Sequence, residues 1–444
     1  MPNKKIKIGF ICLGCDKNRV DLEDVISTLP KDLFEMVGDE KQAELILINT
    51  CAFLKTARDE AKSIIKEMGE LKKTAKLKKL VVMGCLPQLE KEKVLKEFDF
   101  VDAILVPEDY KNAKNVICDL LNIKTDDKKS KNADENKGRS LTTPLHYAYL
   151  KIADGCNNRC AFCKIPFIKG PYKSRKIDDL VNETTALCEK GVREIILVAQ
   201  DVTNFGFDTG EKLVDLLEKL SKIKKLVWIR LLYCYPDLVD DSLIQEIKNN
   251  PKIVHYIDMP LQHASDAVLS NMARKSRKKD IEELIVKLRR EIPDIKIRST
   301  FMVGFPSETE KDFKELCKFL KTYKLDNVGF FKYSREEDTK AYDMAEQVPE
   351  KIKDERLEKI QLLQEKIAKS NNKKLRGQTF KVVVDKVYQD GIYEARAYFS
   401  APDVDFLIYF SSYRKINPGC FVDVTIEDFK DGVFIAQNEK NSTY

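Results

Sequence analysis

Residues 147–166 read YAYLKIADGCNNRCAFCKIP, a short apolar run followed at once by three cysteines. The run 147–153 has the length and composition of a buried strand, and Gly155 breaks it just before the cysteines. Cys156, Cys160 and Cys163 have the spacing C-x3-C-x2-C. Parallel α/β folds place their sites beyond the carboxyl ends of strands, so this position favours a functional site over three buried core cysteines.

Three thiolates at this spacing predict a ligand set for one iron–sulfur cluster. On a four-iron cluster they leave one iron open. That iron can hold S-adenosylmethionine (SAM) by its amino acid end, so that an electron from the cluster breaks a carbon–sulfur bond. A zinc site is the alternative, but a structural zinc normally takes four ligands, and the nearest histidine, His146, precedes the strand.

The chain around this motif alternates strands with amphipathic helices. Six strand-like runs are expected between Tyr147 and Tyr333: 147–153, 194–200, 227–233, 255–260, 295–303 and 326–333. Alternation indicates a parallel sheet, and six units are too few for a closed eight-unit barrel, so we expect an open, partial (β/α)6 barrel. A helix near 351–370, with Leu357, Ile360, Leu363 and Ile367 on one face, closes this part.

The N-terminal part predicts a second parallel α/β domain with a second cysteine set. Cys15, Cys51 and Cys85 follow the three strand patterns 6–13, 44–49 and 80–83. Because parallel strands end at one edge of a sheet, these thiols can meet although they lie far apart in sequence. A buried small residue is the alternative for each cysteine alone. The other six cysteines fall inside strand or helix patterns and are expected in the core: Cys12, Cys118, Cys188, Cys234, Cys317 and Cys420.

The C-terminal part predicts a small OB-like β-barrel. Its five short strand-like runs, broken by turn dipeptides such as Asp390-Gly391, are 379–388, 392–399, 405–410, 420–427 and 432–437. A polar stretch at 124–140 reads as a linker. The expected fold is therefore an α/β multidomain chain, with an N-terminal domain at 1–123, the linker at 124–140, the barrel domain at 141–375 and the β-domain at 376–444.

Composition narrows the class of protein. Hydrophobic residues make up 43% of the 444 residues and charged residues 34%, as in globular proteins. No apolar run reaches the ~18 residues of a membrane span, and the start MPNKKIKIGF is expected to lead into a strand rather than to be a signal peptide, so we expect a cytoplasmic protein. In that compartment thiols stay reduced, so the twelve cysteines are not expected to form structural disulfides. Three histidines are too few for a His-rich zinc or di-iron centre. The net charge of +6 is too small to identify the protein as a nucleic-acid binder.

The central motif resembles the signature of the radical-SAM superfamily, in which an aromatic residue precedes the third cysteine. Phe162 fills that place, and the resemblance implies that it is a cofactor-binding residue. The resemblance implies that Cys156, Cys160 and Cys163 bind a [4Fe-4S] cluster whose fourth iron chelates SAM. It also implies that Gln200, at the end of the next strand, lies where the superfamily contacts the SAM amino group, although the Gly-Gly-Glu often found there is absent.

The whole chain resembles the radical-SAM methylthiotransferases, which join an N-terminal domain with three separated cysteines to a radical-SAM barrel and a C-terminal β-domain called TRAM. The motifs that look like the RimO-type branch are LGCDKNRVD (13–21), NTCAF (49–53), GCL (84–86), DMPLQHAS (258–265), RSTFMVGFPSETE (298–310) and FFKYSREEDT (330–339). The resemblance implies two [4Fe-4S] clusters, with Cys15, Cys51 and Cys85 holding the second. It also implies post-translational methylthio transfer to an aspartate of the small-subunit ribosomal protein S-twelve.

The alternative within the family is the MiaB-type branch, which modifies an adenosine of tRNA. That branch usually shows Gln-Met-Asn after the first cysteine, where Asp16-Lys17-Asn18 stands here. Residues 376–444 hold 8 Lys and Arg against 10 Asp and Glu, which suits a basic ribosomal protein better than RNA, with ordinary surface variation as the alternative. The sulfur source and the electron donor are expected from outside the chain. A third hypothesis, from another class, is a non-catalytic iron–sulfur or zinc protein whose β-barrel binds nucleic acid.

Overall fold

The computed structural model describes residues 5–123 and 139–438. It consists of two compact units: one formed by 1–142 with 154–158 and 163–173, the other by 143–153, 159–162 and 174–444. Most of the predicted linker, 124–138, lies outside the described residues. Arg139, which the prediction placed in the linker, is buried and pairs with Glu23 at 2.8 Å, so this end of the predicted linker is packed against the N-terminal unit.

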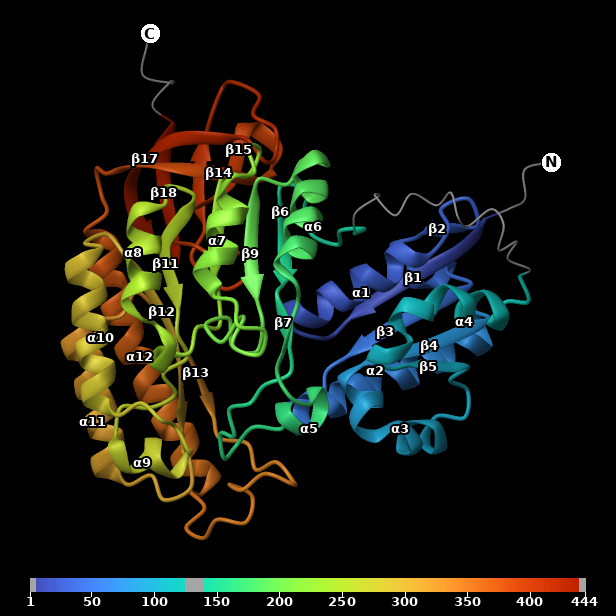
Figure 1. Cartoon of the computed structure of the whole chain (residues 1–444), viewed down its shortest axis with the longest axis horizontal. Helices are drawn as coiled ribbons and strands as arrows, with labels where there is room; N and C mark the ends of the chain where they lie inside the picture. Colours follow the sequence, from blue (N-terminus) through green and yellow to red (C-terminus); the bar gives the residue numbers. More distant parts are fainter. Residues whose placement is uncertain (1–4, 124–138, 439–444) are drawn as a thin grey trace. The chain divides into compact units, whose positions relative to one another are not determined.

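The N-terminal unit is built on a parallel sheet with the strand order β2-β1-β3-β4-β5. Its strands, blue to cyan in Figure 1, are β1 (Ile6–Cys12), β2 (Phe34–Met36), β3 (Leu45–Thr50), β4 (Lys79–Gly84) and β5 (Ala103–Leu105). The predicted parallel α/β domain is thus confirmed. This order is that of flavodoxin-like folds, in which the chain winds in opposite directions from β1 and β3.

Helices cover both faces of this sheet, because alternate strand residues supply two apolar cores. The helices are α1 (Asp16–Thr28), α2 (Lys55–Thr74), α3 (Cys85–Glu97) and α4 (Ala113–Leu120). Ile46 and Ile48 of β3 pack in the core that contains residues of α2 and α3, whereas Leu45 and Leu47 pack with residues of α1 and α4.

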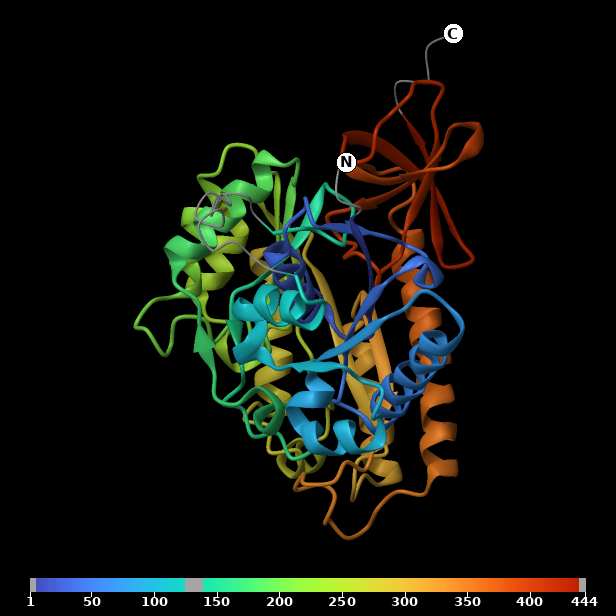
Figure 2. The same ribbon diagram turned by 90° about the vertical axis from the view of Figure 1, so that its right-hand side faces the viewer.

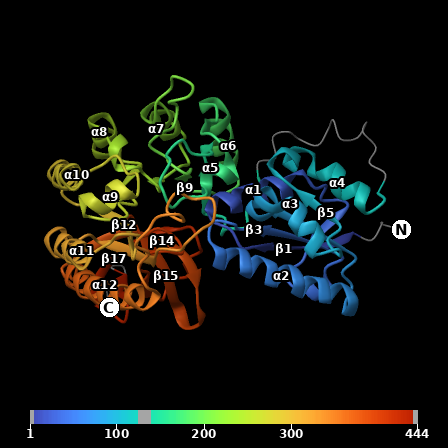
Figure 3. The ribbon, with the colours of Figure 1, turned by 90° about the horizontal axis from the view of Figure 1, so that it is seen from below.

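The central sheet is parallel and has the order β13-β12-β11-β10-β9-β6, which confirms the six-unit partial barrel. Its strands are β6 (Tyr147–Lys151), β9 (Glu194–Val198), β10 (Trp228–Leu231), β11 (Ile253–Asp258), β12 (Lys296–Val303) and β13 (Asn327–Lys332). Figure 3 shows the helices outside these strands: α6 (Ile177–Glu189), α7 (Leu213–Ser221), α8 (Asp241–Asn249), α10 (Lys278–Glu291) and α11 (Glu310–Tyr323).

Helix α12 (Glu350–Lys373) leads into the C-terminal barrel (Figure 2). The predicted apolar face is only partly right. Ile360 and Ile367 are buried, but Leu357 and Leu363 are only half-buried. Polar side chains occupy the rest of the buried face, because Lys353 donates to the Tyr333 carbonyl at 3.1 Å and Arg356 to Glu308 at 2.9 Å.

The C-terminal strands close into a barrel of order β14-β15-β16-β18-β17. They are β14 (Thr379–Val387), β15 (Ile392–Ala397), β16 (Ile408–Ser411), β17 (Phe421–Lys430) and β18 (Val433–Asn438). β14 also pairs with β17, and β16 runs parallel to β18, which is the connectivity of an OB-like barrel. β16 starts three residues later than predicted, since the Asp405 carboxylate accepts the Ala401 N–H at 2.8 Å and holds the preceding turn.

Among the helices of residues 5–123 and 139–438, none combines the length and apolar content that a bilayer crossing requires.

A buried chain of charges joins the central sheet to the C-terminal barrel. Glu194 at the start of β9 accepts hydrogen bonds from Arg230 and Arg396, both at 2.8 Å. Arg396 also donates to Asp385 at 2.6 Å, and Asp385 contacts His146 at 2.6 Å. Burial alone would raise the pKa of Glu194, but the two guanidinium groups bring it below its usual value. The β-barrel is therefore fixed to the amino-terminal end of the parallel strands by ion pairs as well as apolar contacts.

Replacing Arg396 by Met should destabilise the protein by about 3–5 kcal/mol, because Glu194 and Asp385 would stay buried with a cation removed. The measurement is urea unfolding followed by tyrosine fluorescence and circular dichroism. Arg414→Met is the matched control, since Arg414 is exposed, and should change the midpoint little. Equal midpoints for the two variants would show that the charge chain contributes nothing.

Candidate active site

The loop that carries Cys156, Cys160 and Cys163 follows β6 and the short β7 (Ala153–Asp154) and ends at α5 (Ile165–Lys169). The Cys156 N–H donates to the Gly170 carbonyl at 3.1 Å. Gly155 has φ 72°, and a Cβ there would lie 2.1 Å from the Pro171 oxygen, so only glycine fits this turn. All three thiols are half-buried and none is in a disulfide.

The middle of the loop is held by backbone hydrogen bonds on both sides. The Ala161 N–H donates to the Met272 carbonyl at 2.9 Å, and the Ala161 carbonyl accepts the Ala341 N–H at 2.8 Å. These bonds fix Cys160 beside Arg274, whose Nη1 lies 3.9 Å from the Cys160 Sγ. Burial raises the pKa of Tyr235, and the nearby Cys160 thiol raises it further, whereas Arg274 lowers it, so the Tyr235 side chain lies beside the same cysteine. Sequence analysis found neither Arg274 nor Tyr235.

The two residues predicted to contact SAM lie at the same end of the strands. Phe162 packs edge-on against Phe305, with ring centroids 6.4 Å apart, in an apolar cluster that includes Met302 and Tyr333. Gln200 lies two residues beyond β9 and is half-buried. These positions locate the side chains at the carboxyl end of the barrel, and contact with SAM stays a prediction.

The second cysteine set lies at the carboxyl edge of the N-terminal sheet. β1 and β3 end in register, with Cys12 opposite Asn49, and β3 and β4 end with Thr50 opposite Gly84. Cys51 and Cys85 are the next residues after the second pair. Cys15 caps α1 just beyond β1. Because β1 and β3 flank the point where the winding direction reverses, this edge is where flavodoxin-like folds bind ligands.

Close backbone packing at this edge brings the three thiols near each other. Gly84 has φ 95°, and a Cβ there would lie 2.3 Å from the Asn49 Oδ1 and 2.5 Å from the Thr50 oxygen. Asn18 donates to the Thr50 carbonyl at 3.0 Å and lies 3.5 Å from the Cys85 Sγ. Burial raises the pKa of Cys51 and Cys85, and Cys15 raises both further, as Cys51 does for Cys85, so the three thiols lie in one neighbourhood.

Burial controls the protonation of Cys85. It raises the pKa of this thiol to about 11, although the nearby Lys169 ammonium lowers it. Lys169 pairs with Asp21 at 3.2 Å, and both side chains are almost fully buried. A metal centre at this edge would therefore have to displace a proton from Cys85 as it binds. Sequence analysis included Asn18 and Asp21 only as members of a family motif and did not single out Lys169. It assigned no role at this edge to any of the three, because polar residues in a helix are normally expected to be exposed.

Within residues 5–123 and 139–438, no three Cys, His, Asp or Glu side chains converge to hold a single metal ion. A single ion needs every ligand within about 2–2.6 Å of one point. The thiolates of a four-iron cluster each bind a different iron and stay further apart. The donor sets at both edges consist of thiols, the usual ligands of iron–sulfur clusters.

The expectation that the other six cysteines are core residues is right for Cys118, Cys188 and Cys234, which are buried. It is wrong for Cys12 and Cys420, which are exposed, whereas Cys317 is half-buried. Cys12 ends β1, and Cys420 follows the Pro418-Gly419 turn, so both lie where a strand pattern meets the surface.

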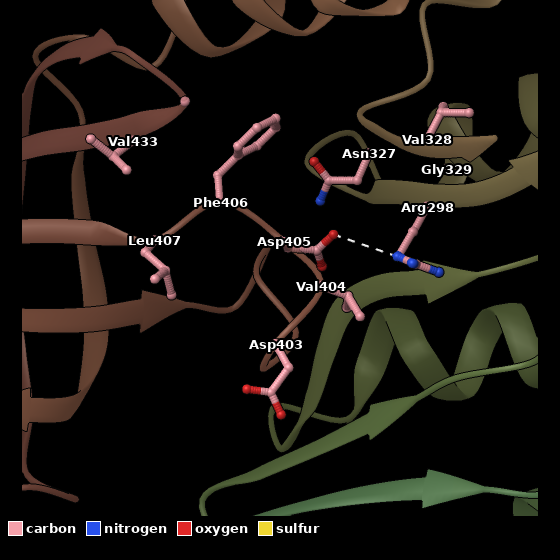
Figure 4. A pocket seen from close by; sticks show the side chains of 11 residues that line it. Arg298, Asn327, Val328, Gly329, Asp403, Val404, Asp405, Phe406, Leu407 and Val433 are labelled. Carbon is pink, nitrogen blue, oxygen red and sulfur yellow. Dashed lines mark ion pairs between the residues drawn. The ribbon is translucent and has the colours of Figure 1, made fainter. Parts of the chain in front are cut away.

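One cavity of about 430 Å³ lies at the opposite end of the central strands (Figure 4). Arg298 and Asn327, at the amino-terminal ends of β12 and β13, line it together with Val404 and Asp405 from the C-terminal barrel. Arg298 contacts Asp258 at 2.9 Å and Asp405 at 3.5 Å. The cavity lies between the C-terminal barrel and the amino-terminal ends of the central strands, whereas the cysteine loop lies at their carboxyl ends.

Comparison with protein families assigns all three parts of the chain. Residues 150–320 match the Radical SAM superfamily, residues 7–106 match Uncharacterized protein family UPF0004, and residues 377–437 match the TRAM domain. Membership of the first superfamily implies a [4Fe-4S] cluster and SAM.

Curated relatives match almost the whole chain. Ribosomal protein uS12 methylthiotransferase RimO of Caldanaerobacter subterraneus is 46% identical over 437 residues, covering 95% of this chain and 97% of the relative. The protein of the same name from Acetivibrio thermocellus is 42% identical over 440 residues, covering 96% and 97%.

Solved structures share the fold at low sequence identity. The radical S-adenosylmethionine methyltransferase TsrM from Kitasatospora setae has a TM-score of 0.52 and 14% identity, over 73% of this chain and 72% of that one.

Replacing Gly84 by Ala should destabilise the N-terminal unit by about 1–3 kcal/mol or more, because the new Cβ would meet Asn49 and Thr50 and the backbone there is unfavourable for any other residue. Thiol accessibility to a maleimide reagent and thermal unfolding would report it, with Cys85 becoming more reactive. Gly38→Ala is the control, since nothing lies within 4 Å of a Cβ at that position. Unchanged stability and Cys85 reactivity would contradict this account of the edge.

Proposed function

This chain belongs to the family of ribosomal protein uS12 methylthiotransferases, RimO, and on that basis we propose that it adds a methylthio group to the β-carbon of an aspartate in uS12. It is an enzyme, a transferase of sulfur-containing groups. The observation that carries the proposal is the identity of 42% and 46% to RimO proteins over about 95% of the chain.

We propose that Cys156, Cys160 and Cys163 hold the [4Fe-4S] cluster of the radical-SAM domain. The support is their spacing, the tightly held loop, and three half-buried thiols without disulfide partners. Such a cluster, when bound, supplies an electron and an open iron that chelates SAM, and so generates a radical able to remove a hydrogen atom from an unactivated carbon. Phe162 packs against Phe305 and so holds the loop in the barrel, and Gln200 would contact the amino group of SAM when SAM is bound.

We further propose that Cys15, Cys51 and Cys85 hold a second [4Fe-4S] cluster, where sulfur is bound before transfer. Their place at the reversal point of a flavodoxin-like sheet supports this assignment. Asn18, 3.5 Å from the Cys85 Sγ, orients that sulfur, and Lys169 supplies a buried positive charge nearby. Three ligands leave one iron open to exogenous sulfur, as catalytic metal sites keep an open position.

Recognition of uS12 is assigned to the TRAM barrel at 376–444. Its net charge of −2, from 8 basic and 10 acidic residues, suits a basic protein. The proposed domains are 1–123, the linker 124–140, 141–375 and 376–444. Electrons and sulfur come from external donors, and the enzyme works in the cytoplasm, where ribosomes are made and thiols stay reduced.

Anaerobic reconstitution should give about eight irons per chain, since two three-cysteine sites would each carry four irons. Replacing Cys156, Cys160 and Cys163 by Ala should halve that value, as should replacing Cys15, Cys51 and Cys85. The measurement is iron and acid-labile sulfide per chain. Replacing the buried Cys118, Cys188 and Cys234 by Ala is the control and should leave the iron unchanged. About four irons per chain in the unaltered protein would contradict the proposal of a second cluster.

The substrate proposal is tested with the intact, reconstituted enzyme. SAM, sulfide and a reductant are supplied anaerobically with uS12 and tRNA in parallel, and both products are read by mass spectrometry. We expect a methylthio group on an aspartate of uS12 and unmodified tRNA. Methylthioadenosine in tRNA, with uS12 unchanged in the same reaction, would move the chain to the MiaB-type activity.

A further inference from the structure

Arg274 differs from the other buried arginines in having no carboxylate partner. Five arginines are buried in the described residues: Arg139, Arg230, Arg274, Arg356 and Arg396. Four of them lie 2.8–2.9 Å from a glutamate oxygen. Arg274 is only 6% exposed, its Nε has no hydrogen-bond partner, and no carboxylate of the described residues pairs with it. Burying a cation destabilises the fold unless an anion compensates its charge, so we infer that an anionic group binds beside Arg274.

The backbone aims Arg274 at one place. Helix α9 (Asp266–Asn271) ends in a Schellman motif, in which the Arg274 N–H donates to the Leu269 carbonyl and the Ala273 N–H to the Ser270 carbonyl, both at 2.9 Å. Ala273 has φ 56°, at a position where glycine is usual. This strained, non-glycine turn fixes the direction of the next side chain.

The guanidinium group is then held on two further sides. Its Nη2 donates to the Pro260 carbonyl at 2.8 Å, and its carbon lies 4.0 Å from the centre of the Tyr235 ring. The third contact is the Cys160 Sγ, 3.9 Å from Nη1. Tyr235, whose ring stacks on this guanidinium group, also lies near the Cys160 thiol, which adds to the effect of burial in raising the pKa of Tyr235. Among the described residues, the group nearest to this guanidinium that can carry a negative charge is therefore the Cys160 thiol, together with whatever it binds.

We propose that Arg274, supported by Tyr235, is the fixed counter-charge of the iron–sulfur cluster on Cys156, Cys160 and Cys163, and sets how readily that cluster takes up an electron. The inference rests on the proposed cluster site. Three thiolates on an oxidised four-iron cluster give about one net negative charge, and one electron from a low-potential donor makes it about two. A cation and hydrogen-bond donors at a ligand sulfur stabilise the more negative state and raise the reduction potential.

The test measures the potential of this cluster by itself. The full-length protein with Cys15, Cys51 and Cys85 replaced by Ala is reconstituted anaerobically, and its redox titration is followed by electron paramagnetic resonance without SAM. Arg274→Gln, Arg274→Lys and Tyr235→Phe are compared with it. Lys275→Gln is the matched control, since it removes the same charge from the adjacent, exposed residue.

Arg274→Gln should lower the equilibrium constant for reduction at least tenfold, which is about 59 mV for one electron. Arg274→Lys and Tyr235→Phe should give smaller decreases, and Lys275→Gln none, since solvent screens an exposed charge. Equal potentials for Arg274→Gln and the parent would overturn the inference. If Arg274→Gln failed to hold iron, unchanged potentials in Arg274→Lys and Tyr235→Phe would overturn it.

Iron analysis separates this inference from the proposed function. A parent with about four irons whose potential does not respond to Arg274 would contradict the inference alone. A parent without iron would contradict the cluster assignment and the inference with it.

Discussion

Parallel strands that end in register place the residues after them side by side, and the site of Cys15, Cys51 and Cys85 depends on this constraint. In the N-terminal sheet, Thr50 pairs with Gly84, so Cys51 and Cys85 follow adjacent strand ends. In the central sheet, the cysteine loop leaves the carboxyl side of β6. Antiparallel strands would have put successive loops at opposite edges. The parallel topology thus brings together, at one edge of a sheet, thiols that lie far apart in the sequence.

Whether a buried charged side chain has a partner of opposite charge distinguishes structural contacts from ligand-binding sites. Glu194, Arg396 and Asp385 compensate one another and fix the C-terminal barrel on the central sheet. Lys169 and Asp21 do the same beside Cys85. Arg274 is the exception among the buried arginines, and it lies on a predicted cluster ligand. Charges that are paired within the protein stabilise the fold, whereas an uncompensated one indicates where an anionic group belongs.

The fold could be predicted from the sequence because periodicity reports strands and helices directly. The six central strands and the five barrel strands all appear close to the expected ranges. The cysteine sets could be found because each follows a strand pattern. Substrate assignment, in contrast, needed family resemblance, since both branches share every cysteine.

Residues that act through tertiary contacts could not be predicted. Arg274 lies more than a hundred residues from Cys160, and Asn18 lies 67 residues from Cys85. The polar part of the buried face of α12 is not predictable for the same reason, because Lys353 and Arg356 are buried by their partners on other elements. Cys12 and Cys420 were assigned to the core because a strand pattern does not show which end is exposed.

We propose that the two cysteine sets perform different steps of one reaction. The radical forms at Cys156, Cys160 and Cys163, and sulfur is supplied at Cys15, Cys51 and Cys85. The most direct measurement follows both products of one variant, in which Cys15, Cys51 and Cys85 are Ala, with SAM, reductant, sulfide and uS12. This account predicts that the variant still forms 5′-deoxyadenosine from SAM, because that step needs only the barrel site, while uS12 gains no methylthio group. Methylthiolation of uS12 at the rate of the unaltered enzyme would contradict it.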